Sequence, residues 1–257
     1  MTQLDSGVMI IHGFDLEGDR EPIVMDRGIY DHHPALSVDG KVLAYASRDD
    51  QSDHIWVHEL DTNGSKHLVK FKEGQISGMT WLDVGQSLLV SHVNDRQTQL
   101  YRIDTQNASV EEVTHTCGEA LRPKFNAWDG YVYVLSQRSD GEIGLCRLQL
   151  LTQQSEHFDI EGVHDFSFGS NGEVLYVSNE TGMMMSLASG EPVSWATSLA
   201  PMLFTLWDTS AYGVVALTLS DPQRSHWLAQ WMSWQDEQWH EFSLPYLPSQ
   251  WGPIELG

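Results

Sequence analysis

The fold is decided by one stretch, Pro34-Ala-Leu-Ser-Val-Asp-Gly40-Lys-Val-Leu-Ala-Tyr-Ala-Ser47, with its continuation His54-Ile-Trp-Val-His-Glu-Leu60-Asp-Thr-Asn-Gly64-Ser-Lys-His-Leu-Val69. An Asp-Gly pair and an Asn-Gly pair interrupt runs of strand-forming residues. Both dipeptides tolerate the positive φ of tight turns, which makes them strong hairpin signals. The stretch therefore predicts four antiparallel strands joined in sequence.

The same pattern repeats along the chain. Turn glycines stand ahead of strand-type runs at intervals of 45, 45, 42 and 41 residues, at Gly40, Gly85, Gly130, Gly172 and Gly213. A period near forty residues with strand patterning inside it is typical of β-propeller blades. The repeat therefore predicts an all-β protein, a β-propeller of four-stranded antiparallel blades.

The repeat assigns residues 1–257 to a single propeller domain. Residues 8–25 match only the last two strands of a blade, and residues 246–257 add a strand at most. We predict six blades, because these two end segments can complete one ring; alternatively, residues upstream of Met1 belong to the propeller. The five full units are expected at about 30–70, 76–115, 120–159, 163–194 and 202–244.

Charge excludes two classes of partner. The 257 residues carry 14 basic and 36 acidic side chains, a formal net charge of −22. Nucleic-acid affinity rests on basic side chains that displace counterions, and anionic membranes attract the same side chains. We expect no direct nucleic-acid binding, no membrane insertion by this segment, and a protein or small ligand as partner.

The compartment stays open on the residues alone. Cys117 and Cys146 are the only cysteines, so pairing is possible but not required, and no metal-ligand spacing involves them. The first residues lack a basic segment and an apolar core of signal-peptide length. A complete chain of this kind would be cytoplasmic.

The quoted stretch resembles the TolB-type propeller repeat, which reads Pro-x-Trp/Phe-Ser-Pro-Asp-Gly-Lys, then an apolar strand, then Ile-Tyr-Val-x-Asp-Leu-x-x-Gly. Val38 stands where that family usually has proline, and the later units are degenerate. The resemblance covers residues 8–244 and implies a bacterial, often exported platform for protein interaction or sensing. The units also resemble the C-terminal, periplasmic propellers of membrane-anchored winged-helix transcription regulators.

Catalytic motifs are absent from the sequence. No G-x-S-x-G elbow, H-E-x-x-H, P-loop or G-x-G-x-x-G is present. We therefore predict a non-catalytic binding module without a cofactor or resident metal. The alternative is a metal-assisted lyase or hydrolase that acts on an acidic polysaccharide, with His32, His33 and His164 as metal ligands.

One candidate binding site follows from the register of the repeat. Positions eight residues before each turn glycine should gather at one mouth of the central channel, by the rotational symmetry of a propeller. Such a ring could hold an anionic ligand or, through its two aspartates, a divalent metal. With their neighbours, these positions are Asp31, His32, His33, Ser77, Arg122, His164, Asp165 and Thr205.

Three further groups of residues have other interpretations. Asp49, Asp50 and Asp53 lack the spacing of a calcium loop, so we interpret them as an acidic hairpin. His54 and His58 share a strand face but lie about 13 Å apart, too far to bind one ion. Tryptophans concentrate near the C-terminus, where they either pack between blades or form an interaction surface, and the candidates for that surface are Trp227, Trp231, Trp234 and Trp239.

Overall fold

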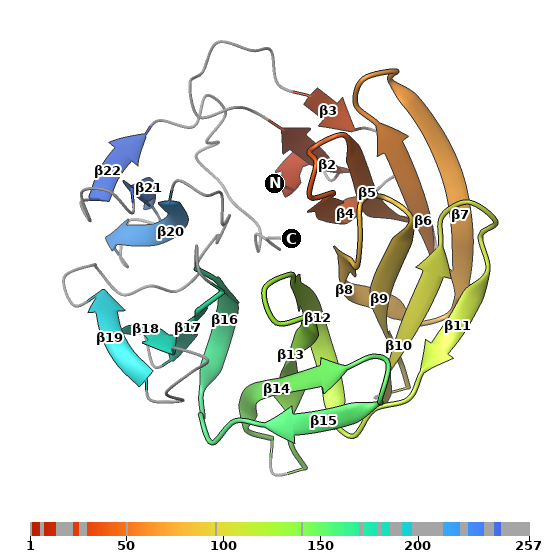
Figure 1. Cartoon of the computed structure of the whole chain (residues 1–257). Helices are drawn as coiled ribbons and strands as arrows, with labels where there is room; N and C mark the ends of the chain where they lie inside the picture. The colour runs from red at the N-terminus through yellow and green to blue at the C-terminus, as the bar shows by residue number, and fades with distance from the viewer. Residues whose placement is uncertain are drawn as a thin grey trace.

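The computed structural model describes residues 2–5, 8–13, 23–25, 30–49, 51–95, 97–139, 141–169, 172–178, 181–185, 192–196, 213–221, 226–233 and 239–242, with side chains for those between 30 and 178 and for Met185. Its strands form separate sheets around a common centre, with β4, β8, β12, β16 and β20 innermost (Figure 1). No helix among these residues has the length and apolarity needed to cross a membrane.

The first complete blade is the stretch that decides the fold. It comprises β4 (Tyr30–Leu36), β5 (Val42–Arg48), β6 (Ser52–Glu59) and β7 (Gly64–Lys72), paired antiparallel in chain order. Each following blade also begins at its innermost strand. The four-stranded antiparallel blades expected from the repeat are thus confirmed.

The next three blades repeat this order. They are formed by β8 (Gln75–Trp81), β9 (Ser87–Asn94), β10 (Gln97–Asp104) and β11 (Val110–Val113); by β12 (Glu119–Asn126), β13 (Tyr131–Gln137), β14 (Ile143–Gln149) and β15 (Gln154–His157); and by β16 (Val163–Phe168), β17 (Val174–Ser178), β18 (Thr181–Met185) and β19 (Pro192–Ala196). The described part of the last sheet consists of β20 (Gly213–Asp221), β21 (His226–Ser233) and β22 (Trp239–Phe242).

The N-terminal strands join the first complete blade. β2 (Val8–Gly13) and β3 (Ile23–Met25) pair antiparallel within the half-unit expected at 8–25, and β1 (Thr2–Asp5), which the repeat did not predict, pairs with β2 on its other side. A single parallel pairing, Met9 with Tyr30, links β2 to β4. The expected closing segment at 246–257 lies outside the described residues.

The turn glycines have the conformation that the repeat requires. Gly40, Gly85, Gly130 and Gly172 have φ values of 69°, 78°, 73° and 78°. This left-handed region is costly for residues with a Cβ atom, which explains why glycine recurs there. Gly213 is the first residue of β20, and the residues before it lie outside the described part.

Apolar layers between neighbouring blades form the core. Ala44 and Ile55 of the first blade pack with Trp81 and Leu88 of the second. Equivalent layers join the second blade to the third, through Leu100 and Val132 among others, and the third to the fourth. The alternating apolar residues of the repeat thus bury their side chains between sheets, as in packed β-sheets generally.

Gly78 marks the closest approach of two innermost strands. A Cβ atom added to it would lie 2.8 Å from the Cα of Arg122 and 3.2 Å from Cδ of Pro123. Because the obstacle is backbone, β8 and β12 would have to separate. No positive φ is involved at Gly78, so the restriction is steric.

Replacing Gly78 with alanine should therefore lower the free energy of unfolding by about 2–3 kcal/mol, the upper part of the roughly 1–3 kcal/mol range of overpacked contacts. Gly40→Ala is the matched control, because its added Cβ meets nothing within 4 Å and only the positive φ is unfavourable; a loss of about 1 kcal/mol is expected there. Urea denaturation measures both variants. A Gly78 effect no larger than that at Gly40 would contradict the close approach.

A disulfide links Cys117, between β11 and β12, to Cys146 in β14, with the two Cα atoms 5.8 Å apart. The bond ties the segment that connects the second and third blades to β14, the third strand of the third blade. Both sulfurs belong to the apolar layer between these blades. The pairing that the sequence left open is thus present.

Candidate functional site

Every innermost strand with described side chains carries a bulge at the positions singled out by the repeat. The pairing register shifts by one residue between His32 and Ala35, Ile76 and Gly78, Leu121 and Lys124, and Val163 and Asp165. Bulges interrupt the hydrogen-bond ladder and redirect side chains. His33 and Arg122, each followed by proline, adopt φ values of 50° and 49° at their bulges.

Contacts connect these bulges from blade to blade. In the first step, Asp53 of β6 lies 3.5 Å from the His32 imidazole and accepts a 2.5 Å hydrogen bond from the backbone N–H of Ile76. Ile76 precedes Ser77, whose hydroxyl lies 2.7 Å from that of Ser91. The first and second bulges are thus joined through one buried carboxylate.

The chain of contacts continues around the ring. Gly78 touches the backbone of Arg122, and two residues later the Lys124 ammonium donates a 2.6 Å hydrogen bond to the Phe166 carbonyl. The same ammonium lies 3.6 Å from the Asp165 carboxylate. Seven of the eight predicted positions therefore lie along one run of contacting innermost strands. Thr205 lies outside the described residues.

Burial divides the predicted positions into three groups, of which Ser77 and Arg122 form the half-buried one. Asp31, His32, His33 and Asp165 are buried, whereas His164 is exposed. In the described part of the chain, no three His, Cys, Asp or Glu side chains lie together in a group that could hold a metal ion. The structure therefore does not assemble His32, His33 and His164 into the metal site that the polysaccharide-enzyme alternative requires.

Arg122 differs from the other described arginines. Arg48, Arg102, Arg138 and Arg147 all bond or pair with neighbouring groups. No hydrogen bond or ion pair of the Arg122 side chain occurs among the described residues. A half-buried guanidinium in this position presents unused donors, which match carboxylate or phosphate oxygens geometrically.

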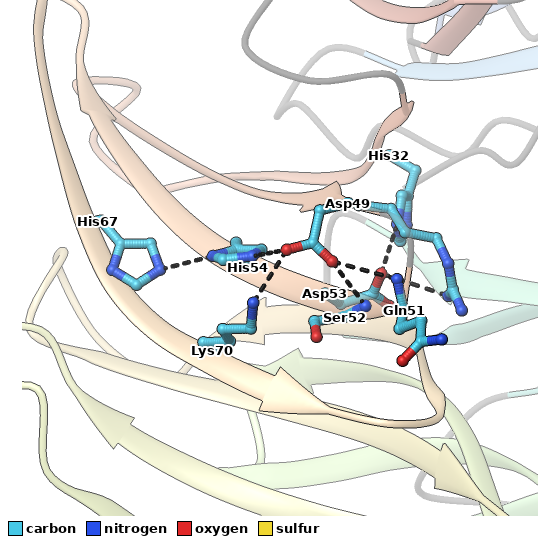
Figure 2. A network of polar contacts seen from close by, with 9 residues as sticks. His32, Asp49, Gln51, Ser52, Asp53, His54, His67 and Lys70 are labelled. Atoms are coloured by element: carbon cyan, nitrogen blue, oxygen red, sulfur yellow. Dashed lines mark hydrogen bonds and ion pairs between the residues drawn. The ribbon is translucent and has the colours of Figure 1, made fainter.

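Asp53 organises the polar network beside the first bulge (Figure 2). Its side chain has no exposed surface, and besides His32 and Ile76 it contacts the Arg48 guanidinium at 3.3 Å. Burial acts to raise the pKa of Asp53, but the interactions with His32, the Ile76 amide and Arg48 outweigh it, so the pKa lies below its ordinary value. Asp53 is therefore a buried carboxylate with a structural role between two blades.

Asp49 shapes the adjacent loop. One carboxylate oxygen accepts hydrogen bonds from the backbone N–H groups of Gln51 and Ser52, and the other contacts His54 Nε2 at 2.8 Å and Lys70 Nζ at 2.9 Å. Hydrogen bonds from His54 and Lys70 hold the pKa of Asp49 below its ordinary value. The acidic hairpin interpretation fits this geometry, since both described carboxylates serve neighbouring protein groups; Asp50 lies outside the described residues.

A polar cavity that the repeat gave no reason to expect lies between the second and third blades. Its volume is about 550 Å³, and amide, hydroxyl and carboxylate side chains dominate its wall. Burial lowers the pKa of His115 in this wall, which favours the neutral imidazole. The lining residues come from β10, β11, the crossover to β12, the first residue of β12, and the end of β13 with the residues after it; they include Gln97, Gln99, Glu112, Glu119 and Arg138.

Thr98, at the same cavity, carries a buried hydroxyl with no hydrogen-bond partner among the described residues. Replacing it with valine removes an unsatisfied polar group without changing its shape. We expect Thr98→Val to raise the free energy of unfolding by about 1 kcal/mol. Thermal unfolding measures the change.

Thr105 supplies the matched control, since its hydroxyl donates to the Gly85 carbonyl at 2.8 Å in a comparably buried position. Thr105→Val should destabilise by about 1 kcal/mol. Equal effects at the two positions would show that the Thr98 hydroxyl is bonded in solution.

The tryptophan surface falls largely outside what the structure describes. Trp227 and Trp231 lie in β21 and Trp239 in β22, where Trp239 pairs with Met232. Their side chains and the whole of Trp234 lie outside the described residues. The interaction surface stays a prediction.

No protein-family model matches the chain. Among solved structures, TolB from Acinetobacter baumannii is similar with a TM-score of 0.72 at 16% identity, over 90% of this chain and 60% of that one. A nidogen/laminin complex chain matches at 0.66 and 10% identity, over 94% and 91% of the two chains. The β-propeller domain of the Trilobed protease from Pyrococcus furiosus matches at 0.62 and 12%, over 95% and 82%.

These similarities establish the fold, which is that of TolB-like propellers. The chain spans about 60% of the length of the TolB that it matches. Identities of this size carry the architecture only, and one architecture hosts many functions.

Proposed function

We propose that the chain is a non-catalytic β-propeller that binds an acidic group of a protein partner or small ligand at its innermost strands. The observation that carries the proposal is the unused Arg122 guanidinium at a bulge. In a chain with net charge −22, the Arg122 guanidinium has no counterion among the described residues, although it lies in a run of polar residues on the innermost strands. A carboxylate of a bound molecule supplies one.

We further propose that the propeller works in an oxidising compartment, the periplasm, as the sensory or interaction part of a larger bacterial protein. The disulfide between Cys117 and Cys146 supports this location, because disulfides persist in oxidising compartments and are rare in reducing ones. The TolB-like fold and the resemblance to periplasmic propellers of membrane-anchored regulators favour the same location.

Site-specific photo-crosslinking in the native cells tests the proposed interaction surface. A crosslinking residue at position 164 is exposed and leaves Arg122 intact, whereas one at Leu151, 92% exposed in the turn after β14, reports encounters at the outer rim. We expect a discrete adduct from position 164, none from position 151, and loss of the adduct in Arg122→Gln.

Two results would overturn the proposal. One is the same adduct from both positions, with or without Arg122. The other is depolymerisation of an acidic polysaccharide by the purified protein and its loss in His164→Ala, which would favour an enzyme.

A further inference from the structure

We propose that His54 and His67 together bind a divalent transition-metal ion such as Zn²⁺ or Cu²⁺ on the outer hairpin of the first complete blade. This site is independent of the innermost strands and of the proposed partner. It arises from β6 and β7, where His67 pairs with Trp56 and its ring lies against that of His54, two residues before Trp56 on the same strand.

The spacing of the two ring nitrogens suits one ion. His54 Nδ1 and His67 Nε2 lie 3.0 Å apart, with ring centroids 5.2 Å apart (Figure 2). Imidazole nitrogens bind zinc at about 2.0–2.1 Å, so two of them in a tetrahedral site lie about 3.3 Å apart. The rings need to separate by only a few tenths of an ångström for an ion to replace the hydrogen bond between them.

Asp49 orients the first of these ligands. The other nitrogen of His54, Nε2, lies 2.8 Å from the Asp49 carboxylate, which accepts a hydrogen bond from its N–H. The lone pair of His54 then resides on Nδ1 and faces His67. Metal-binding histidines usually donate their second ring N–H to such a carboxylate, which fixes the tautomer and raises the basicity of the ligand.

His67 is suited to serve as the second ligand. Its Nε2 is the ring nitrogen that faces His54 Nδ1, so an ion placed between the two rings meets one nitrogen from each of them. Its ring is exposed, so an ion and its remaining water ligands reach it from solvent. Among the described residues no third metal-binding side chain joins the pair, so water completes the coordination.

Lys70 limits the affinity. Its ammonium lies 2.9 Å from Asp49, on the carboxylate side of His54 in Figure 2, and repels a cation bound to the pair. The proposal therefore makes opposite predictions for two neighbours. Removing the lysine charge should tighten metal binding, whereas removing the orienting carboxylate should weaken it.

Calorimetric titration of the untagged protein with Zn²⁺ is the primary test. We expect His54→Gln and His67→Gln each to weaken binding at least tenfold, Asp49→Asn to weaken it less, and Lys70→Gln to strengthen it. His157→Gln is the control, since that exposed histidine lies in another blade and its ring hydrogen-bonds the Thr116 carbonyl. It should leave this binding event unchanged.

Cu²⁺ titration followed by electron paramagnetic resonance identifies the ligands directly. Two equivalent nitrogen couplings are expected in the wild type and should be lost in the His54→Gln/His67→Gln double variant. Both histidines are on the surface, so circular dichroism should show an unchanged fold. Undiminished Zn²⁺ affinity in the double variant, or no Zn²⁺ binding by the wild type, would refute the site.

Discussion

Replacing Asp53 with alanine is expected to lower the free energy of unfolding by about 2–4 kcal/mol, because it removes hydrogen bonds to a charged group and leaves a buried amide unsatisfied, each of which counts for roughly 1–3 kcal/mol. The substitution leaves the Arg48 guanidinium and the Ile76 amide without their acceptor and cuts the connection between the first two blades. Urea denaturation measures the loss. Asp61→Ala is the control, because Asp61 is exposed in the turn after β6, and its effect should stay within about 0.5 kcal/mol.

The pH dependence of stability distinguishes the contribution of the Asp53 charge from the contribution of its side-chain volume. The pKa of Asp53 in the folded protein lies below the ordinary value of 3.8, so its contribution is present above that value and is lost as the pH falls through the folded pKa. The difference in stability between wild type and Asp53→Asn should therefore shrink below about pH 4. A constant difference down to pH 2 would contradict the role of its charge.

Removing the disulfide is expected to destabilise the protein by a similar amount. The bond between Cys117 and Cys146 closes a loop of 29 residues, and the entropy of closing such a loop corresponds to about 3.5 kcal/mol. The Cys117→Ser/Cys146→Ser variant should show this loss in denaturant, and the wild type should show it when reductant is added. The double variant is the control for the reductant, because added reductant should leave its stability unchanged.

The disulfide prediction also bears on the compartment. Production in a reducing cytoplasm should yield a reduced, less stable protein, and production in the periplasm an oxidised one. Equal stability of the wild type with and without reductant would show that the two thiols do not pair in solution.

The repeat predicted the architecture because tight turns leave a chemical signature. The positive φ at Gly40, Gly85, Gly130 and Gly172 excludes most side chains, so glycine recurs at the period of the blades. The N-terminal strand β1 carried no such signal, since residues 2–5 have no turn glycine and match no part of the repeat. Their pairing depends on contacts with β2.

The candidate site was predictable only in part. Counting eight residues back from each glycine located the bulges, because every blade repeats the same register. Contacts between blades decide which of these residues are buried. They also decide that Arg122, alone among the described arginines, lacks a partner. No local pattern in the sequence specifies these contacts. The role of Asp53 depends on the amide of Ile76, a residue 23 positions away.

The contact of His54 with His67 could not be predicted from the sequence for a different reason. The distance between His54 and His58 along one strand follows from strand geometry, and it correctly separates those two residues. The approach of His67 requires the register of the β6–β7 hairpin, which shifts at a bulge. An unshifted hairpin would have paired His54 with Val69, whereas here His54 pairs with Lys70, so the surroundings of the histidine pair could be found only in three dimensions.

The central claim is that the Arg122 guanidinium has no partner within the described part of the protein and is available to a ligand, and nuclear magnetic resonance of the arginine Nε–H groups tests it most directly. The signal of Arg122 is assigned with Arg122→Lys, and the protein is titrated with a glutamate-rich peptide at low salt. We expect the Arg122 signal to shift and saturate, while those of Arg102, Arg138 and Arg147, already bonded within the protein, move little. An unmoved Arg122 signal at saturating peptide, or equal shifts of all four, would contradict the account.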